Sequence, residues 1–164
     1  MRSIAVLVVL FGCVISVAQN SRKNVPLAPL PEAVVEAKKV FLANGGSDLA
    51  FDRFYADIKD WKRWELVGSP EGADLIFDLA YRVDNNGTRV WSASNASTGT
   101  TQVFSAEMLD PQLVLTIYDG KSKTSLWATV DHTRLARREK NREKEMINSA
   151  DRLVDQLKTR LRSQ

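Results

Sequence analysis

The sequence VFLANGGSDLAFDRFYADI, from Val40 to Ile58, predicts the structural unit around which the rest of the chain is arranged. Its first three residues form a compact apolar run that is typical of a strand and is followed by a turn signal. Beyond the glycines, apolar residues recur at helical spacing and predict a helix from Asp48 to Trp61. We therefore expect a strand that leads through a tight turn into a helix covering a sheet.

A strand, a glycine turn and a helix N-terminus also form many phosphate sites. The pair Gly45-Gly46 has neither of the glycine spacings that wrap a phosphate, and no Lys or Arg follows before Arg53. Ser47 is a suitable N-cap, and Asp48 complements the helix dipole. We interpret the turn as a structural connection rather than a ligand site.

Further elements follow from hydrophobic periodicity and turn residues. A short helical turn is expected at Glu32 to Ala37, before a first strand at Lys39 to Ala43. Expected strands cover Arg63 to Ser69, Ala73 to Asp84, Gln112 to Gly120 and Thr124 to Thr133, and an apolar stripe predicts a long C-terminal helix containing Met146, Ile147, Ala150, Leu153, Val154, Leu157 and Leu161.

The region between residues 84 and 112 is the most turn-rich part of the chain. Asn86-Gly87 is a strong hairpin signal, so residues 88–94 are expected to return as the partner strand. The small polar residues 95–102 indicate a mobile loop, and residues 104–111 a brief turn. The fold prediction is α+β, with a mostly antiparallel sheet of four to five strands and two helices on one face.

The N-terminus has the pattern of a secretory signal peptide. Arg2 precedes an apolar run from Ile4 to Ala18, which is shorter than the roughly 20 residues of a membrane span and ends in small residues. We expect export, with residues 1–18 removed, an extended proline-containing linker at 19–31 and one domain at 32–164.

Cys13 offers an alternative to cleavage after Ala18. The sequence from Leu10 to Cys13 partly matches the box that precedes a lipid-modified cysteine in bacterial lipoproteins. Lipidation there would anchor the protein to the outer membrane, whereas cleavage after Ala18 would leave a periplasmic or secreted chain without cysteine. A lipid at Cys13 is the only membrane contact that we predict.

Few side chains in the sequence suit catalysis or metal binding. His132 is the single histidine and has no second histidine or cysteine near it, so the usual spacing of zinc ligands is missing. No serine lies in a G-x-S-x-G elbow. We predict no catalytic, metal-binding or cofactor-binding residue, and a hairpin or strand-end position for His132.

Two groups of residues are candidates for an interaction surface. Most tryptophans are expected to pack in the core, but Trp91 has polar neighbours and suits stacking on a sugar or peptidoglycan. A basic run before the last helix suits an acidic envelope polymer; it contains Arg134, Arg137, Arg138 and Lys140. The net charge is only +3, and no aromatic residue interleaves the run, so nucleic acid is not an expected partner.

Three segments resemble a known group: AKKVFLANGG, WKRWELVGSPEGADLIFDL and LTIYDGKSKTSLWATV. They are similar to uncharacterised secreted or lipid-anchored bacterial proteins, a group that resembles the small α+β domains of the LpoB, CsgG and TolB amino-terminal type. The shared motifs are structural, namely Ala73-Asp74 at a strand start and the hairpin from Gly120 to Trp127. The resemblance implies an envelope interaction module and supplies no catalytic motif.

The prediction from sequence is therefore an exported, non-enzymatic protein that binds an envelope protein or polymer. The alternative is a small hydrolase that uses carboxylates on the sheet edge or on the 95–102 loop.

Overall fold

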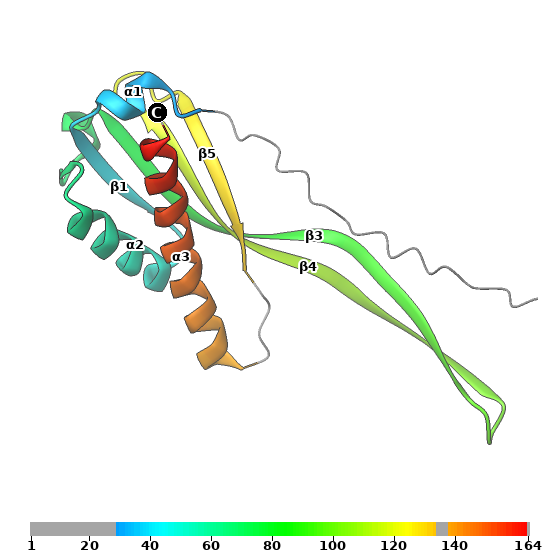
Figure 1. Ribbon diagram of the computed structural model, residues 1–164. Helices are drawn as coiled ribbons and strands as arrows, with labels where there is room; N and C mark the ends of the chain where they lie inside the picture. Colours follow the sequence, from blue (N-terminus) through cyan, green and yellow to red (C-terminus); the bar gives the residue numbers. More distant parts are fainter. Residues whose placement is uncertain (1–28, 134–137, 164) are drawn as a thin grey trace, which may run out of the picture.

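The computed structural model describes residues 29–133 and 138–163 as an α+β structure (Figure 1). The predicted signal peptide, Cys13 and most of the linker lie outside these residues, so those predictions stay predictions. The elements, in chain order, are α1 (Glu32–Glu36), β1 (Lys39–Gly45), α2 (Asp48–Trp61), β2 (Glu65–Leu66), the 3-10 turn η1 (Pro70–Gly72), β3 (Leu75–Asn95), β4 (Thr100–Asp119), β5 (Ser125–His132) and α3 (Glu139–Arg162).

The five strands form one sheet in the order β2-β1-β3-β4-β5. β3, β4 and β5 are antiparallel, as expected, but β1 runs parallel to both β2 and β3. The sheet is therefore mixed, and most of its residue pairs are antiparallel, as the sequence predicts. The reason for the parallel pairs is α2, which joins β1 to β2 as a crossover and returns the chain to the same end of the sheet.

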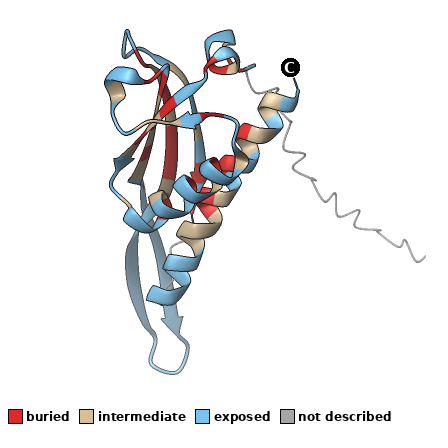
Figure 2. Ribbon diagram, turned by 90° about the vertical axis from the view of Figure 1, so that its left-hand side faces the viewer, coloured by how far each residue is buried: buried red, intermediate tan, exposed pale blue. Residues whose placement is uncertain are grey.

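Both long helices cover one face of the sheet, as the sequence predicts (Figures 1 and 2). α2 buries Ala50, Phe54 and Ile58, and α3 buries an apolar stripe that includes Leu153 and Leu157. These side chains meet the helix-facing residues of the sheet, which are Val40, Leu42, Leu75, Phe77, Leu79, Leu113, Leu115 and Ile117. This single core positions every other feature of the domain.

The predicted hairpin at Asn86-Gly87 is wrong. β3 continues through this pair to Asn95, and the chain reverses at residues 96–99 before β4 begins at Thr100. The register between β3 and β4 shifts between Asn85 and Thr88, which marks a β-bulge, and Gly87 has φ of +104°. A glycine with positive φ suits a bulge as well as a hairpin turn, so the sequence signal was real but did not specify its structure.

The neighbouring predictions change for the same reason. Only the first part of the expected 95–102 loop is a turn, because Thr100 already pairs with Asn95. The brief turn expected at residues 104–111 is instead regular strand within β4. The expected strand at Arg63 to Ser69 is confirmed at Glu65–Leu66 alone.

The glycine turn joins β1 to α2, as the sequence predicts. Ser47 occupies the N-cap position but makes no side-chain capping bond. Instead, Asn44 Oδ1 accepts hydrogen bonds from the backbone N–H groups of Gly46 and Ser47 at 3.0 and 3.2 Å. Asn44 also donates to the carboxylate of Asp48 at 2.7 Å, so local groups already occupy this helix end.

Candidate functional site

The most unusual feature of the molecule is a two-stranded ribbon that projects beyond the sheet (Figure 1). We call it the arm and define it as residues 83–95 of β3 and 100–109 of β4, with the turn between them. All these residues are exposed, in contrast to the buried residues of the same strands in the sheet (Figure 2). The arm therefore contributes nothing to the core.

Both outer edges of the arm are open within the described structure. β1 pairs with β3 only as far as Ala80, and β5 pairs with β4 only from Gln112 onward. Beyond these points, every second backbone N–H and C=O of each strand points away from the ribbon. Such long open edges are templates for pairing with another chain.

An aromatic pair lies near the middle of the arm. Trp91 is directly opposite Phe104, and their rings stack with centroids 5.7 Å apart and planes inclined by 19°. Both side chains are about two-fifths exposed, at 44% and 40%. This pair is on the sheet face away from the helices, because Phe104 alternates with the buried residues of β4.

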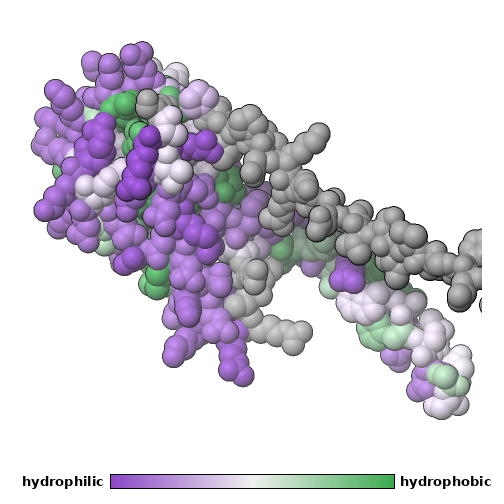
Figure 3. Space-filling view, in the orientation of Figure 1, coloured by the Kyte–Doolittle hydropathy of each residue, from purple (hydrophilic) through white to green (hydrophobic). Residues whose placement is uncertain are grey.

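Apolar side chains also occupy the other face of the arm. Val90 and Val103 are 64% and 70% exposed there. Between residues 85 and 109 the only charged residues are Arg89 and Glu107. The arm surface is consequently much less polar than the helices and loops of the body (Figure 3).

A polar cluster joins the arm to the sheet. His132 Nδ1 lies 3.0 Å from Asp110 Oδ2, and Gln112 Nε2 donates to Asp110 and to Asp84 at 3.1 Å each. Asn86 donates to Asp110 from the bulge at 3.3 Å. These bonds, with that from His132 the most important, lower the pKa of Asp110. His132 is thus a strand-end residue, as the sequence predicts.

The predicted interaction residues that the structure describes belong to different elements. Trp91 is in the arm, whereas Arg138 is the N-cap of α3 and Lys140 lies in its first turn, both exposed. Arg134 and Arg137 lie outside the described residues. Their roles in binding stay predictions, although the exposure of Trp91 agrees with the expectation that it differs from Trp64 in the core.

Sequence reasoning missed Phe104 because it assigned this region to a turn. A signal was present, since the two arm strands carry the related sequences Val-Trp-Ser-Ala from Val90 and Val-Phe-Ser-Ala from Val103. Two strands with the same pattern, joined by small polar residues, are typical of a long hairpin.

Two carboxylates converge between the helices, at a place that the hydrolase hypothesis did not predict. Arg53 Nε lies 2.6 Å from Asp151, and Arg53 Nη2 lies 3.3 Å from Asp57. Burial raises the pKa of Asp57, and a hydrogen bond with Asp151 raises it further. Both carboxylates are already engaged by the same guanidinium, and neither lines any of four hollows on the described surface.

The described residues contain no group of three or more His, Cys, Asp or Glu side chains that would hold a metal ion. Within the same residues, no helix combines the length and apolarity that crossing a membrane requires.

Comparison with solved structures finds matches, one of which is described here. No family model and no curated protein matches the chain. The solution structure of uncharacterized lipoprotein B from Nitrosomonas europaea is 14% identical, covers 79% of this chain and 81% of its own, and has a TM-score of 0.37. A TM-score of this size does not establish a common fold. The resemblance to LpoB, CsgG and TolB domains therefore stays a prediction, and the arguments below rest on this chain alone.

Proposed function

We propose that this protein is an exported binding module of the cell envelope and that the arm is its docking element. The observation that carries the proposal is the exposed Trp91–Phe104 stack on a ribbon with two open edges. An isolated two-stranded ribbon is only marginally stable in water, so a partner that covers these faces would stabilise it. Aromatic side chains are also the residues that most often dominate binding energy.

The partner class that fits best is another protein. Open strand edges offer backbone hydrogen bonds to a polypeptide, and the two apolar faces offer side-chain contacts on alternate residues. A sugar polymer would use the Trp91 face without needing the open edges. The predicted signal peptide supports an activity outside the cytoplasm.

Site-specific photo-crosslinking tests the docking role. Benzoylphenylalanine replaces Phe104 in the arm and, as a matched control, Tyr55 on the body, because both side chains are 40% exposed. We expect one protein adduct to recur in native envelopes from position 104 and to be absent from position 55. Equal adducts at the two positions, or none at position 104, would contradict the proposal.

The mature N-terminus tests the export part separately. Intact-mass measurement is expected to show a chain that begins at Gln19, or one that begins at an acylated Cys13. A chain retaining Met1 in the cytoplasm would contradict export while leaving the arm experiment interpretable.

A hydrolase is the weaker candidate. The Asp57–Asp151 pair supplies two close carboxylates, but Arg53 pairs with both of them, which leaves them less suited to act on a sugar or peptide bond. Turnover that is lost in Asp151→Asn, with the fold intact, would favour this alternative.

A further inference from the structure

A second surface, separate from the arm, lies along β5, which is one of the two edge strands of the sheet. Among the described residues β5 pairs with β4 alone, so its other edge is open over eight residues. Its sequence contains neither Lys nor Pro, the residues that commonly protect sheet edges. The edge at β2 differs, since that strand has only two residues and follows Lys62-Arg63.

The backbone groups that face outward from β5 can be assigned. Thr133 N–H donates to the carbonyl oxygen of Pro111 in β4 at 2.8 Å. Because antiparallel strands alternate between inward and outward residues, the N–H and C=O groups of Ala128, Val130 and His132 point away from β4. The register from Gln112 to Ile117 is regular along this stretch, so the alternation is not interrupted.

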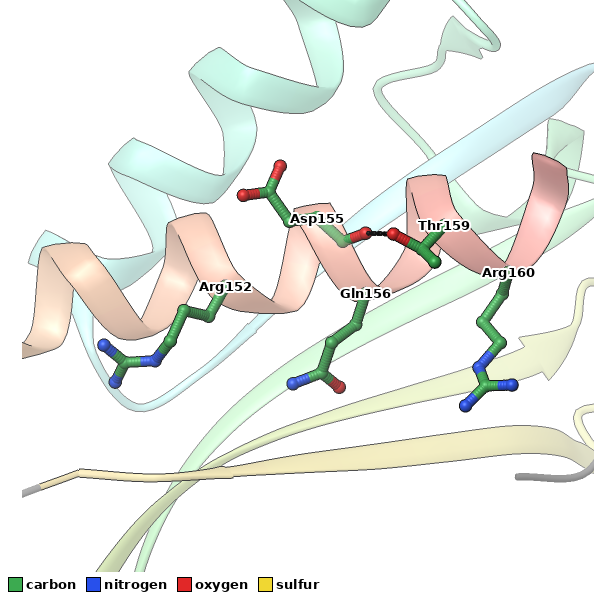
Figure 4. Close-up of a pocket in the computed structure, with 5 residues that line it drawn as sticks. All are labelled: Arg152, Asp155, Gln156, Thr159 and Arg160. Atoms are coloured by element: carbon green, nitrogen blue, oxygen red, sulfur yellow. Dashed lines mark hydrogen bonds between the residues drawn. The ribbon is translucent and has the colours of Figure 1, made fainter. Parts of the chain in front are cut away.

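A row of side chains from α3 runs above this edge (Figure 4). Arg152 donates to Asp131 of β5, with its shortest contact 2.7 Å, and Gln156 Oε1 accepts from Thr129 at 2.7 Å. Arg160 follows one turn later on the same side of the helix (Figure 4). The two bonds therefore show that a step of four residues along α3 corresponds to a step of two residues along β5.

This match has a geometric cause. Four helical residues advance about 6.0 Å along the axis, and two strand residues advance about 6.6 Å. A further strand added beside β5 would have the same repeat. Each second side chain of that strand would consequently lie next to one member of the α3 row.

The row favours carboxylate partners. Arg152 pairs with Asp131 through Nε and Nη2, so its Nη1 is the part of the guanidinium directed to a further acceptor, and Arg160 adds a second cation. Gln156 keeps its amide N–H groups for donation because its oxygen accepts from Thr129. Together with Asp155 and Thr159, they line a hollow of about 370 Å³ against α3. The carboxylate of Asp155 points to the other side of the helix, away from the row (Figure 4).

Two further cations adjoin the beginning of the strand. Lys121 and Lys123 lie in the turn that precedes β5, and both are exposed. The open edge is thus bordered by positive charge above and at one end, which complements an acidic ligand.

We propose that β5 and α3 bind an extended acidic segment of a partner protein by strand addition. The segment forms backbone hydrogen bonds with Ala128, Val130 and His132. Its alternate carboxylates face Arg152, Gln156 and Arg160. This site uses no residue of the arm and does not depend on the arm's proposed docking role.

The test uses a synthetic peptide of about nine residues, the length that spans β5, with Glu and Thr alternating. Amide chemical shifts of the isotopically labelled protein locate binding, and a titration gives the dissociation constant. We expect shifts along β5 and the row of α3. A peptide with Lys in place of Glu, and one N-methylated on alternate residues, are each expected to bind at least about tenfold more weakly.

Three protein variants complete the experiment. Val130→Pro removes an outward N–H without breaking the β4 ladder, and Gln156→Glu keeps the acceptor for Thr129 but repels the peptide. Both are expected to weaken binding about tenfold or more, whereas Glu143→Gln, at an exposed position near the start of α3 and outside the hollow, is expected to change it less than about twofold. Thermal unfolding checks that each variant is folded.

Several results would overturn the proposal. They are no binding of the Glu peptide, equal binding of the Lys or N-methylated peptides, or unchanged affinity of folded Val130→Pro and Gln156→Glu. Shifts confined to the arm would also overturn it and would assign peptide binding to the arm instead. A chain lacking the arm is expected to bind the peptide normally, which separates this outcome from failure of the arm proposal.

Discussion

Arg152 and Asp131 form a two-pronged ion pair that ties α3 to β5, with Nε 2.9 Å from Oδ1 and Nη2 2.7 Å from Oδ2. Ser149 also donates to the same carboxylate, at 2.5 Å. The arginine side chain is 44% exposed, whereas that of Asp131 is 11% exposed. Because the Asp131 carboxylate is the more buried group, it is the one whose charge would be left uncompensated if the ion pair were removed.

Removing Arg152 is expected to destabilise the fold. Arg152→Ala leaves a nearly buried carboxylate with Ser149 as its remaining partner, which we expect to cost about 2–3 kcal/mol in urea unfolding. The double variant Arg152→Ala/Asp131→Ala should lose less than the sum of the single losses, because it removes the unpaired charge. Strictly additive losses would show that the pair is not coupled.

Gly120 is expected to tolerate no side chain. A Cβ atom there would lie 2.0 Å from the carbonyl oxygen of Ala73, and backbone cannot move aside as a flexible side chain can. Gly120→Ala should cost about 4 kcal/mol or more, or prevent folding. Gly68→Ala is the control, since a Cβ there meets nothing within 4 Å. Equal thermal midpoints for the two variants would disprove the constraint.

The bulge at Gly87 is expected to set the register of the arm. Gly87→Val places a β-branched residue at φ of +104°, a strained conformation that the strand escapes by closing the bulge. Trp91 would then oppose Val103, and the nuclear Overhauser contacts between Trp91 and Phe104 should disappear. Gly87→Asn, which tolerates positive φ better, should keep them. Retention of these contacts in the valine variant would refute the assignment.

Asp57 is expected to lower stability at neutral pH. Its pKa is raised by burial first and then by the hydrogen bond with Asp151, so the folded state holds its proton above the ordinary value of 3.8. Stability from this group is greatest below that value and declines as pH rises through the raised pKa. Asp57→Asn should therefore be more stable than the parent at pH 7, with the gap closing in acid. A gap that is constant between pH 3 and pH 7 would exclude this cause.

Deleting the arm is expected to leave the body folded. Replacement of residues 85–109 by Asn-Gly joins Asp84 to Asp110, which are already paired across the strands, through a two-residue turn. No buried residue is removed, so the free energy of unfolding should change by less than about 0.5 kcal/mol. A loss of several kcal/mol would show that the arm supports the core.

The sequence was sufficient for the elements that carry an uninterrupted apolar pattern. α2, β5 and α3 lie where helical or alternating periodicity places them, because burial on one face is what the pattern records. The parallel placement of β1 was not predictable in this way, since a periodicity of two is the same in parallel and antiparallel strands. It depends on the direction in which α2 returns the chain.

The arm was missed because it has no buried face. Its strands alternate small polar and apolar residues that pack against nothing, so burial could not distinguish strand from loop, and Asn86-Gly87 supplied a misleading turn signal. The β5–α3 row depends on contacts such as Thr129–Gln156, which join residues far apart in the chain. Sequence spacing alone does not contain that information.

Because the arm is separate from the core, its length sets the distance that the tip reaches from the body. A strand advances about 3.3 Å per residue, so the twelve residues or so beyond Asp84 hold the tip roughly 40 Å from the body. Adding two residues to each strand would extend this reach by about 7 Å and keep the same side chains on each face. The number of residues in the arm can therefore change to match the distance to a partner, while the body stays unchanged.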